Sequence, residues 1–208
     1  MRVCRLFAVL VFTSACAGPA DAQSDTPAEL ALQQGAQKTS IDPAVNPDAA
    51  AMAEFKASVE AYADLHRKLA KGSAKHQQTS DPAKINAATE ALAAKVREAR
   101  ANAKHGDIFT PAIRPVFRRL LAPELKGADG RDAKAVLKDD APAPGSVPFK
   151  VNAKYPDDQP RPTVPANLLL TLPTLPEPLE YRIVGQHLLL LDTEADLIVD
   201  YILNAIST

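Results

Sequence analysis

Hydrophobic residues recur at helical spacing over residues 49–121. Asp48 is expected to cap the first helix, because apolar side chains then follow every three or four residues and form one stripe. Asp81-Pro82 predicts the start of a second helix, and Thr110-Pro111 the start of a third, which Pro123 should end. A loop of about nine residues between the first two favours an antiparallel hairpin. We therefore expect a three-helix unit, and the stripe of its first helix comprises Met52, Phe55, Val59, Tyr62, His66 and Leu69.

The end of the chain changes to a period of two, which is typical of strands. Residues 180–184 and 187–191 flank Gly185-Gln186, and a two-residue turn that begins with glycine predicts a hairpin in which Val184 faces His187. A third strand is expected over residues 196–202. The predicted fold class is therefore α+β, with the helices followed by a proline-rich linker and a small three-stranded antiparallel β module. The buried face of the hairpin should hold Tyr181, Ile183, Leu188 and Leu190.

Prolines are concentrated between the helical unit and the last strands. Ten of the 18 prolines lie between residues 142 and 178, a density that excludes regular helix and central strand. We predict a linker over residues 122–148, with one or two turns of helix at 131–139. The β module then occupies 149–208, and it begins with a short edge strand at 149–151 and a short helix at 166–172.

The N-terminus has the pattern of a signal peptide. Arg2 and Arg5 precede an apolar run of about ten residues, which is too short to cross roughly 30 Å of hydrocarbon. The small residues of Ala20-Asp21-Ala22 predict cleavage after Ala22, so residues 1–22 are a signal peptide and the protein is periplasmic or secreted. Residues 23–48 are predicted to be a disordered tether, and no transmembrane span is expected in the mature chain.

An alternative processing route remains open. The segment that runs from Thr13 to Cys16 resembles a permissive lipoprotein box, in which Cys16 would carry the lipid and anchor the chain to the envelope. Cys4 and Cys16 are the only two cysteines, and both lie in the leader. The mature chain cleaved after Ala22 is therefore expected to contain no disulfide, thiol nucleophile or thiolate metal site.

Charge is polarised along a chain of 208 residues that is almost neutral overall. Residues 49–121 carry thirteen Lys and Arg against seven Asp and Glu, whereas residues 122–208 carry eight against thirteen. Either the two halves attract each other within one molecule, or the basic half meets an anionic partner such as a membrane surface. The second interpretation would use a basic edge of Arg114, Arg118 and Arg119. An aromatic content of 5% argues against binding of nucleic acid.

No catalytic, cofactor or metal motif emerges from the sequence. The four histidines have no metal-ligand spacing; we expect His66 in the core and His187 at the surface. The run from Asp192 to Asp196 resembles the start of a calcium loop, but Leu197 and Leu203 occupy the positions that need glycine and glutamate. Glycine-rich phosphate loops and serine-hydrolase strings are absent. A catalytic group assembled only in three dimensions stays open.

The last 40 or so residues carry a recognisable pattern. Its positions are Leu172-Pro173, Leu175-Pro176, Tyr181, Val184-Gly185, Asp192, Ile198-Val199-Asp200 and Ile202. In this segment the chain resembles the C-terminal module of the periplasmic nickel/cobalt-homeostasis family, and the whole chain resembles uncharacterised exported bacterial proteins. The resemblance implies a periplasmic metal-stress accessory. Our first expectation is a non-enzymatic binding protein of the cell envelope without a cofactor; the accessory role and an enzyme of unrecognised type are the alternatives.

Overall fold

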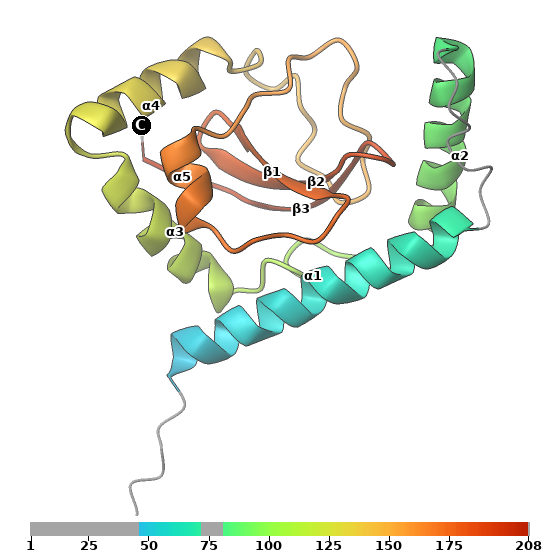
Figure 1. The fold of residues 1–208 in the computed structure, drawn as a ribbon, viewed down its shortest axis with the longest axis horizontal. Coiled ribbons are helices and arrows are strands. Elements are labelled where there is room, and N and C mark those ends of the chain that lie inside the picture. Colours follow the sequence, from blue (N-terminus) through green and yellow to red (C-terminus); the bar gives the residue numbers. More distant parts are fainter. Residues whose placement is uncertain (1–45, 72–80, 208) are drawn as a thin grey trace, which may run out of the picture. The chain divides into compact units, whose positions relative to one another are not determined.

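The protein has an α+β fold. The structure is a computed structural model that describes residues 46–71 and 81–207, all of which belong to one compact unit over residues 44–208. Within these residues there are five helices and three strands (Figure 1): α1 (Pro47–Lys71), α2 (Pro82–Ala99), α3 (Ile113–Glu124), α4 (Gly127–Asp139), α5 (Ala166–Thr171), β1 (Leu179–Val184), β2 (His187–Asp192) and β3 (Leu197–Ile202). None of the helices in this part of the chain combines the length and apolar character that a bilayer crossing needs.

The predicted signal peptide over residues 1–22, with Cys16, lies outside the described residues. Most of the predicted tether over residues 23–48 lies there too. Its last two residues, Pro47 and Asp48, instead form the first turn of α1. Asp48 is therefore not the helix cap: the Asn46 side chain accepts a hydrogen bond from the Asp48 N–H at 3.0 Å and takes that role.

The three strands form an antiparallel meander in the order β1-β2-β3. Val184 faces His187 and Ile183 faces Leu188, so the predicted hairpin register is confirmed. On the outer edge of β3, the Asn152 N–H donates to the Ile198 carbonyl at 2.8 Å. The predicted edge strand over residues 149–151 does not form, because the backbone contacts to β3 begin only at Asn152. Among the described residues no strand pairs with the outer edge of β1.

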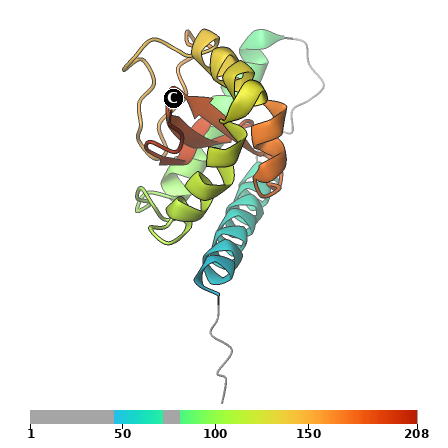
Figure 2. The ribbon, with the colours of Figure 1, turned by 90° about the vertical axis from the view of Figure 1, so that its left-hand side faces the viewer.

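Both faces of the sheet are buried. The predicted face packs with the helices in the main core, and Tyr181, Ile183, Leu188 and Leu190 all belong to it. The opposite face forms a second apolar cluster that includes Val184 and Leu189. We expected this face to be more exposed, but residues 147–155 fold across it. In Figure 2 the strands lie between α5 and this loop.

The helices follow the predicted order but not the predicted packing. Asp81 caps α2 as expected, since its side chain accepts the Ala83 N–H at 3.0 Å. The first half of α2 is exposed, however, and Ile85 remains 40% exposed. α2 is buried only in its second half, at Leu92, Ala93 and Val96. The predicted antiparallel hairpin of α1 and α2 does not form, because α2 rises steeply from the end of α1 instead of lying along it (Figure 1). The alanine-rich first half offers little apolar surface to bury.

The predicted linker over residues 122–148 is largely a helix. α3 continues through Pro123 to Glu124, and α4 then covers thirteen residues instead of one or two turns. Ala133 and Leu137 of α4 enter the main core. The helices and strands therefore share one core rather than forming a helical unit and a separate β module. The short helix α5 agrees with the prediction to within one residue.

Candidate functional site

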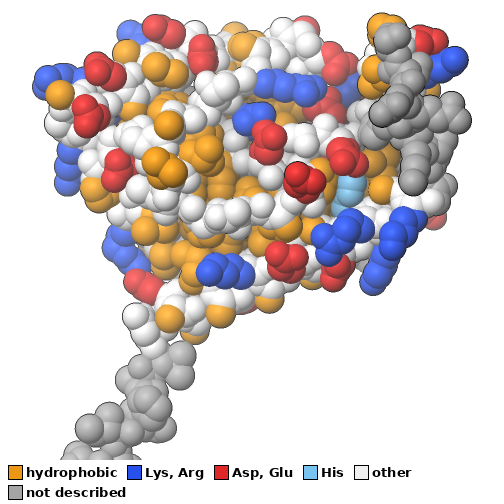
Figure 3. All heavy atoms as spheres, viewed as in Figure 1, with side chains coloured by type: hydrophobic (Ala, Val, Ile, Leu, Met, Phe, Trp, Pro, Cys, Tyr) orange, Lys and Arg blue, Asp and Glu red, His pale blue; other side chains and the backbone are white. Residues whose placement is uncertain are grey.

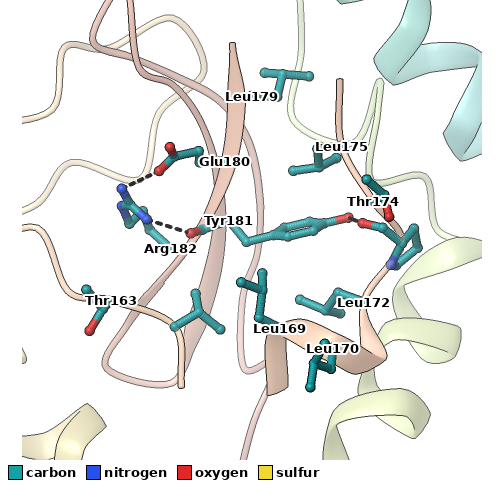
Figure 4. Close-up of a pocket in the computed structure, with 12 residues that line it drawn as sticks. Thr163, Leu169, Leu170, Leu172, Thr174, Leu175, Leu179, Glu180, Tyr181 and Arg182 are labelled. Carbon is teal, nitrogen blue, oxygen red and sulfur yellow. Dashed lines mark hydrogen bonds and ion pairs between the residues drawn. The ribbon is translucent and has the colours of Figure 1, made fainter. Parts of the chain in front are cut away.

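An apolar groove lies beside the free edge of β1. It is bounded by β1, by α5 and by the extended segment that joins them, and it has a volume of about 600 Å³. Figure 4 shows the Tyr181 ring crossing from β1 toward that segment, with leucine side chains on both sides of it. The apolar lining comprises Val164, Leu169, Leu170, Leu172, Pro173, Leu175, Leu179 and Tyr181.

Prolines and one tyrosine build this groove. Pro173 and Pro176 lack backbone N–H donors, which favours an extended segment over further helix between α5 and β1. The Tyr181 hydroxyl donates to the Pro173 carbonyl at 3.0 Å, and the Leu179 N–H donates to the Pro176 carbonyl at 3.0 Å. Burial raises the pKa of Tyr181 well above its usual value, so the hydroxyl remains a hydrogen-bond donor. These bonds hold the groove open at a defined width.

The groove exposes large apolar side chains. Leu170 is 86% exposed and Leu169 is 49% exposed. Figure 3 shows hydrophobic side chains gathered in the middle of this face, over the region of α5 and β1, with charged side chains around them. A contiguous apolar patch with a polar rim is typical of a surface that binds a partner.

The rim of the groove carries one pair of opposite charges. The Arg182 guanidinium contacts the Glu180 carboxylate, and its Nη1 donates to the Tyr181 carbonyl at 3.3 Å. Both side chains lie on the opposite side of β1 from the Tyr181 ring (Figure 4). The Arg182 Nε is buried and has no hydrogen-bond partner within the described part of the chain. The Arg182 guanidinium therefore has one N–H donor without an acceptor among the described residues.

The predicted basic edge does not form one open cluster. Arg114 donates from Nε to the Phe109 carbonyl at 2.8 Å, and Arg118 donates to the Leu203 and Asn204 carbonyls at 2.9 and 3.0 Å. Arg119 pairs with Asp48. Each arginine thus has a partner in the chain, but only Arg118 contacts the acidic half, and it bonds backbone carbonyls there rather than carboxylates. A contact of these arginines with an anionic partner stays a prediction.

A buried polar cluster joins α1 to the end of β2. The Tyr62 hydroxyl donates to Asp192 Oδ2 at 2.6 Å, and the Glu194 and Ala195 N–H groups donate to Oδ1 at 3.0 and 2.8 Å. His66 is buried, as predicted, and its Nε2 lies 3.5 Å from Asp192 and 3.6 Å from Glu194. A hollow of about 520 Å³ opens beside His66 and Glu194. Asp192 ties a helix to a strand turn, which is a structural role.

Asp200 ties the loop before α3 to the sheet. Its carboxylate accepts the N–H groups of Gly106, Ile108, Phe109 and Tyr201 at 2.8 to 3.2 Å, and the His105 Nδ1 lies 3.2 Å away. The sequence analysis placed Asp200 in the C-terminal pattern but assigned no role to its carboxylate. An aspartate inside an otherwise aliphatic strand is the signal that could have found it, because a buried charge needs several donors.

The other acidic side chains and histidines that the structure describes do not come together as a metal site. Asp196, in the segment that resembles the start of a calcium loop, accepts a hydrogen bond from Arg161 at 2.8 Å and shares no ligand site with Asp192. His187 accepts the Asn204 N–H at 3.0 Å and is partly buried, which lowers its pKa; His76 lies outside the described residues. Across residues 46–71 and 81–207, no group of three or more His, Cys, Asp or Glu could hold a metal ion.

Comparison with known proteins finds no match: no family model, no curated protein and no solved structure is similar to this chain. The resemblance of the last residues to the nickel/cobalt-homeostasis family therefore stays a prediction. The groove beside β1 was not predicted either. Its sequence signal is the run Leu168–Leu170, which places more apolar side chains on a six-residue helix than one face can bury.

Proposed function

We propose that this protein is exported and acts as a non-enzymatic binding protein of the cell envelope, with the β1 groove as its binding surface. The observation that carries the proposal is Leu170, which is 86% exposed at the side of an apolar groove and next to a free strand edge. A large apolar side chain exposed to this extent favours a partner that removes it from water.

The polar side chain that crosses the β1 groove supports binding there rather than catalysis. Tyr181 is the polar side chain that crosses the groove, and its hydroxyl is bonded to Pro173. The buried carboxylates of Asp192 and Asp200 accept backbone N–H groups that hold loops to the sheet. A general acid or base needs a free lone pair or proton within reach of a substrate, and these groups are already bonded. Export is supported by the leader pattern of residues 1–22.

Site-specific photo-crosslinking in intact cells tests the groove as a binding surface. A photoreactive amino acid at Leu170 should give a discrete covalent adduct with the partner. The matched control is Val136 of α4, an exposed apolar residue that is 43% accessible and lies outside the groove. We expect no discrete adduct at Val136. The absence of an adduct at Leu170, or the same adducts at both positions, would overturn the proposal.

A further inference from the structure

We infer that the hollow beside His66 binds a small molecule that carries both an ammonium and a carboxylate group, as free α-amino acids do. This hollow is separate from the groove beside β1, and the two share no lining residue. The inference therefore does not depend on the proposed function. Three properties support it: the size of the hollow, the arrangement of charge around it, and a buried imidazole nitrogen.

The first property is the size and composition of the hollow. It lies between the last turns of α1 and the two segments that flank the β1–β2 hairpin. Its volume of about 520 Å³ falls within the range of pockets that hold small molecules. Five of its seven lining residues have side chains that can carry a charge. A ligand that complements this lining therefore bears charged groups of its own.

The second property is that the charged residues lie on two walls of opposite sign. α1 contributes Arg67 and Lys71, whereas Glu177 precedes β1 and Glu194 follows β2. Figure 3 shows acidic and basic side chains on either side of a histidine over the second half of α1. Among the described residues no ion pair joins the two walls, and Arg67 pairs within its own helix.

A ligand with both signs of charge can bond to both walls at once. A simple anion would bond to the basic wall but lie close to two carboxylates, and a simple cation would meet the reverse arrangement. A zwitterion can direct its ammonium toward Glu177 and Glu194 and its carboxylate toward Arg67 and Lys71. Hydrogen bonds between ionised groups are stronger than those between neutral groups. The charge arrangement therefore favours a zwitterion over either single ion.

The third property is the environment of His66 on the acidic side of the hollow. Its side chain is 3% exposed, and Nε2 has no hydrogen-bond partner among the described residues. This nitrogen lies 3.5 Å from Asp192 and 3.6 Å from Glu194, farther than a normal hydrogen bond. A buried polar atom without a partner is uncommon and calls for a physical reason. An ammonium has three donors, so one that binds at Glu194 still has donors for the imidazole beside it.

Isothermal titration calorimetry of the full-length gene product with each standard L-amino acid tests the inference. We expect at least one amino acid to bind. Its N-acetyl derivative lacks the ammonium, and its primary amide lacks the carboxylate. Each derivative should bind at least about tenfold more weakly than the free amino acid, because hydrogen bonds to one charged group are lost.

Single substitutions test the two walls separately. E194Q removes a negative charge from one wall and R67Q removes a positive charge from the other. Each should raise the dissociation constant at least about tenfold. E54Q and K56Q are the matched controls, because both positions are exposed on α1 and lie outside the hollow. Both controls should leave the dissociation constant unchanged, and thermal unfolding of each variant confirms that it is folded.

Several outcomes would overturn the inference. One is the absence of binding by every amino acid up to the millimolar range, and another is binding that E194Q and R67Q leave unchanged. Binding that the amide retains and E194Q loses would identify a simple amine as the ligand, and binding that the acetyl derivative retains and R67Q loses would identify a simple anion. Either result overturns the zwitterion. None of these results bears on the β1 groove, which crosslinking at Leu170 tests independently.

Discussion

The contact between Tyr62 and Asp192 places a phenol and a carboxylate in the interior. Tyr62 is 4% exposed and Asp192 is fully buried, and their oxygens are 2.6 Å apart. Burial, the charge of Asp192 and the hydrogen bond to it all raise the pKa of the Tyr62 hydroxyl far above its usual value of about 10. The folded protein therefore keeps this proton where the unfolded chain loses it.

This difference predicts a stability loss in alkali that depends on one hydroxyl. A raised pKa in the folded state stabilises the protein fully below about pH 10, and the stabilisation falls above it by about 1.4 kcal/mol per pH unit. Y62F should cost about 1.5–3 kcal/mol at pH 8, because a bond to a buried charge is lost. The difference in the free energy of unfolding between the unchanged protein and Y62F should then become smaller from pH 10 to 11. Urea unfolding at each pH measures it, and a constant gap would contradict the assignment.

The burial of a side chain could be predicted from the sequence where residues close to it along the chain determine its surroundings. His66 was predicted in the core from its place in the stripe of α1, and it is buried. Its neighbour Asp192 is 130 residues from its partner Tyr62 along the chain. The sequence shows that Asp192 ends an aliphatic strand. It does not show that the Tyr62 hydroxyl donates to this carboxylate, which offsets the cost of burying its charge.

Helices and strands also differ in how far the sequence alone predicts them. The register of the β1–β2 hairpin was predictable to the residue and its strand ends to within one residue, because alternation and a glycine-led turn are local signals. α4 was underestimated because its burial depends on a close approach between backbones. An added Cβ at Gly130 would lie 2.3 Å from the Leu125 carbonyl carbon, so glycine allows α4 to pack directly against the end of α3. Periodicity within α4 contains no information about that neighbour.

Gly130→Ala tests this packing. Helix propensity alone predicts a gain of about 1 kcal/mol, since alanine is the better helix former. The added methyl group meets backbone atoms that cannot move aside, and overpacking of this kind costs about 1–3 kcal/mol. We expect net destabilisation in urea unfolding, whereas R131A at the exposed neighbouring position should change the free energy of unfolding by less than about 0.5 kcal/mol. A more stable G130A protein would contradict the close approach.

At the scale of the whole molecule, the basic middle and acidic end of the chain are tied together. Arg100 donates to the Val199 carbonyl at 3.2 Å and Arg118 to the Leu203 carbonyl at 2.9 Å. Asp200 accepts N–H groups from the loop that precedes α3. The charge pattern indicated such attraction but not its form, since many of these bonds are made to backbone groups. Similarly, the run Leu168–Leu170 carries apolar side chains that the sequence shows, but the groove exists only because α5 lies beside β1 in the fold.

At the same scale, the proposed export would depend on residues 1–22, and two substitutions distinguish the two processing routes. Signal peptidase requires small side chains at the cleavage site, so A22L should block removal of the leader, whereas C16S should leave the released chain beginning at Gln23. Lipid anchoring predicts that C16S blocks processing, because Cys16 is then the modified residue. It also predicts that A22L is processed normally, because Ala22 then lies within the released chain, after the cleavage site. The intact mass of the protein from fractionated cells measures both. Processing that fails in C16S and proceeds in A22L would replace the proposed freely diffusing binding protein by one held at the membrane, with the groove beside β1 kept close to the lipid surface.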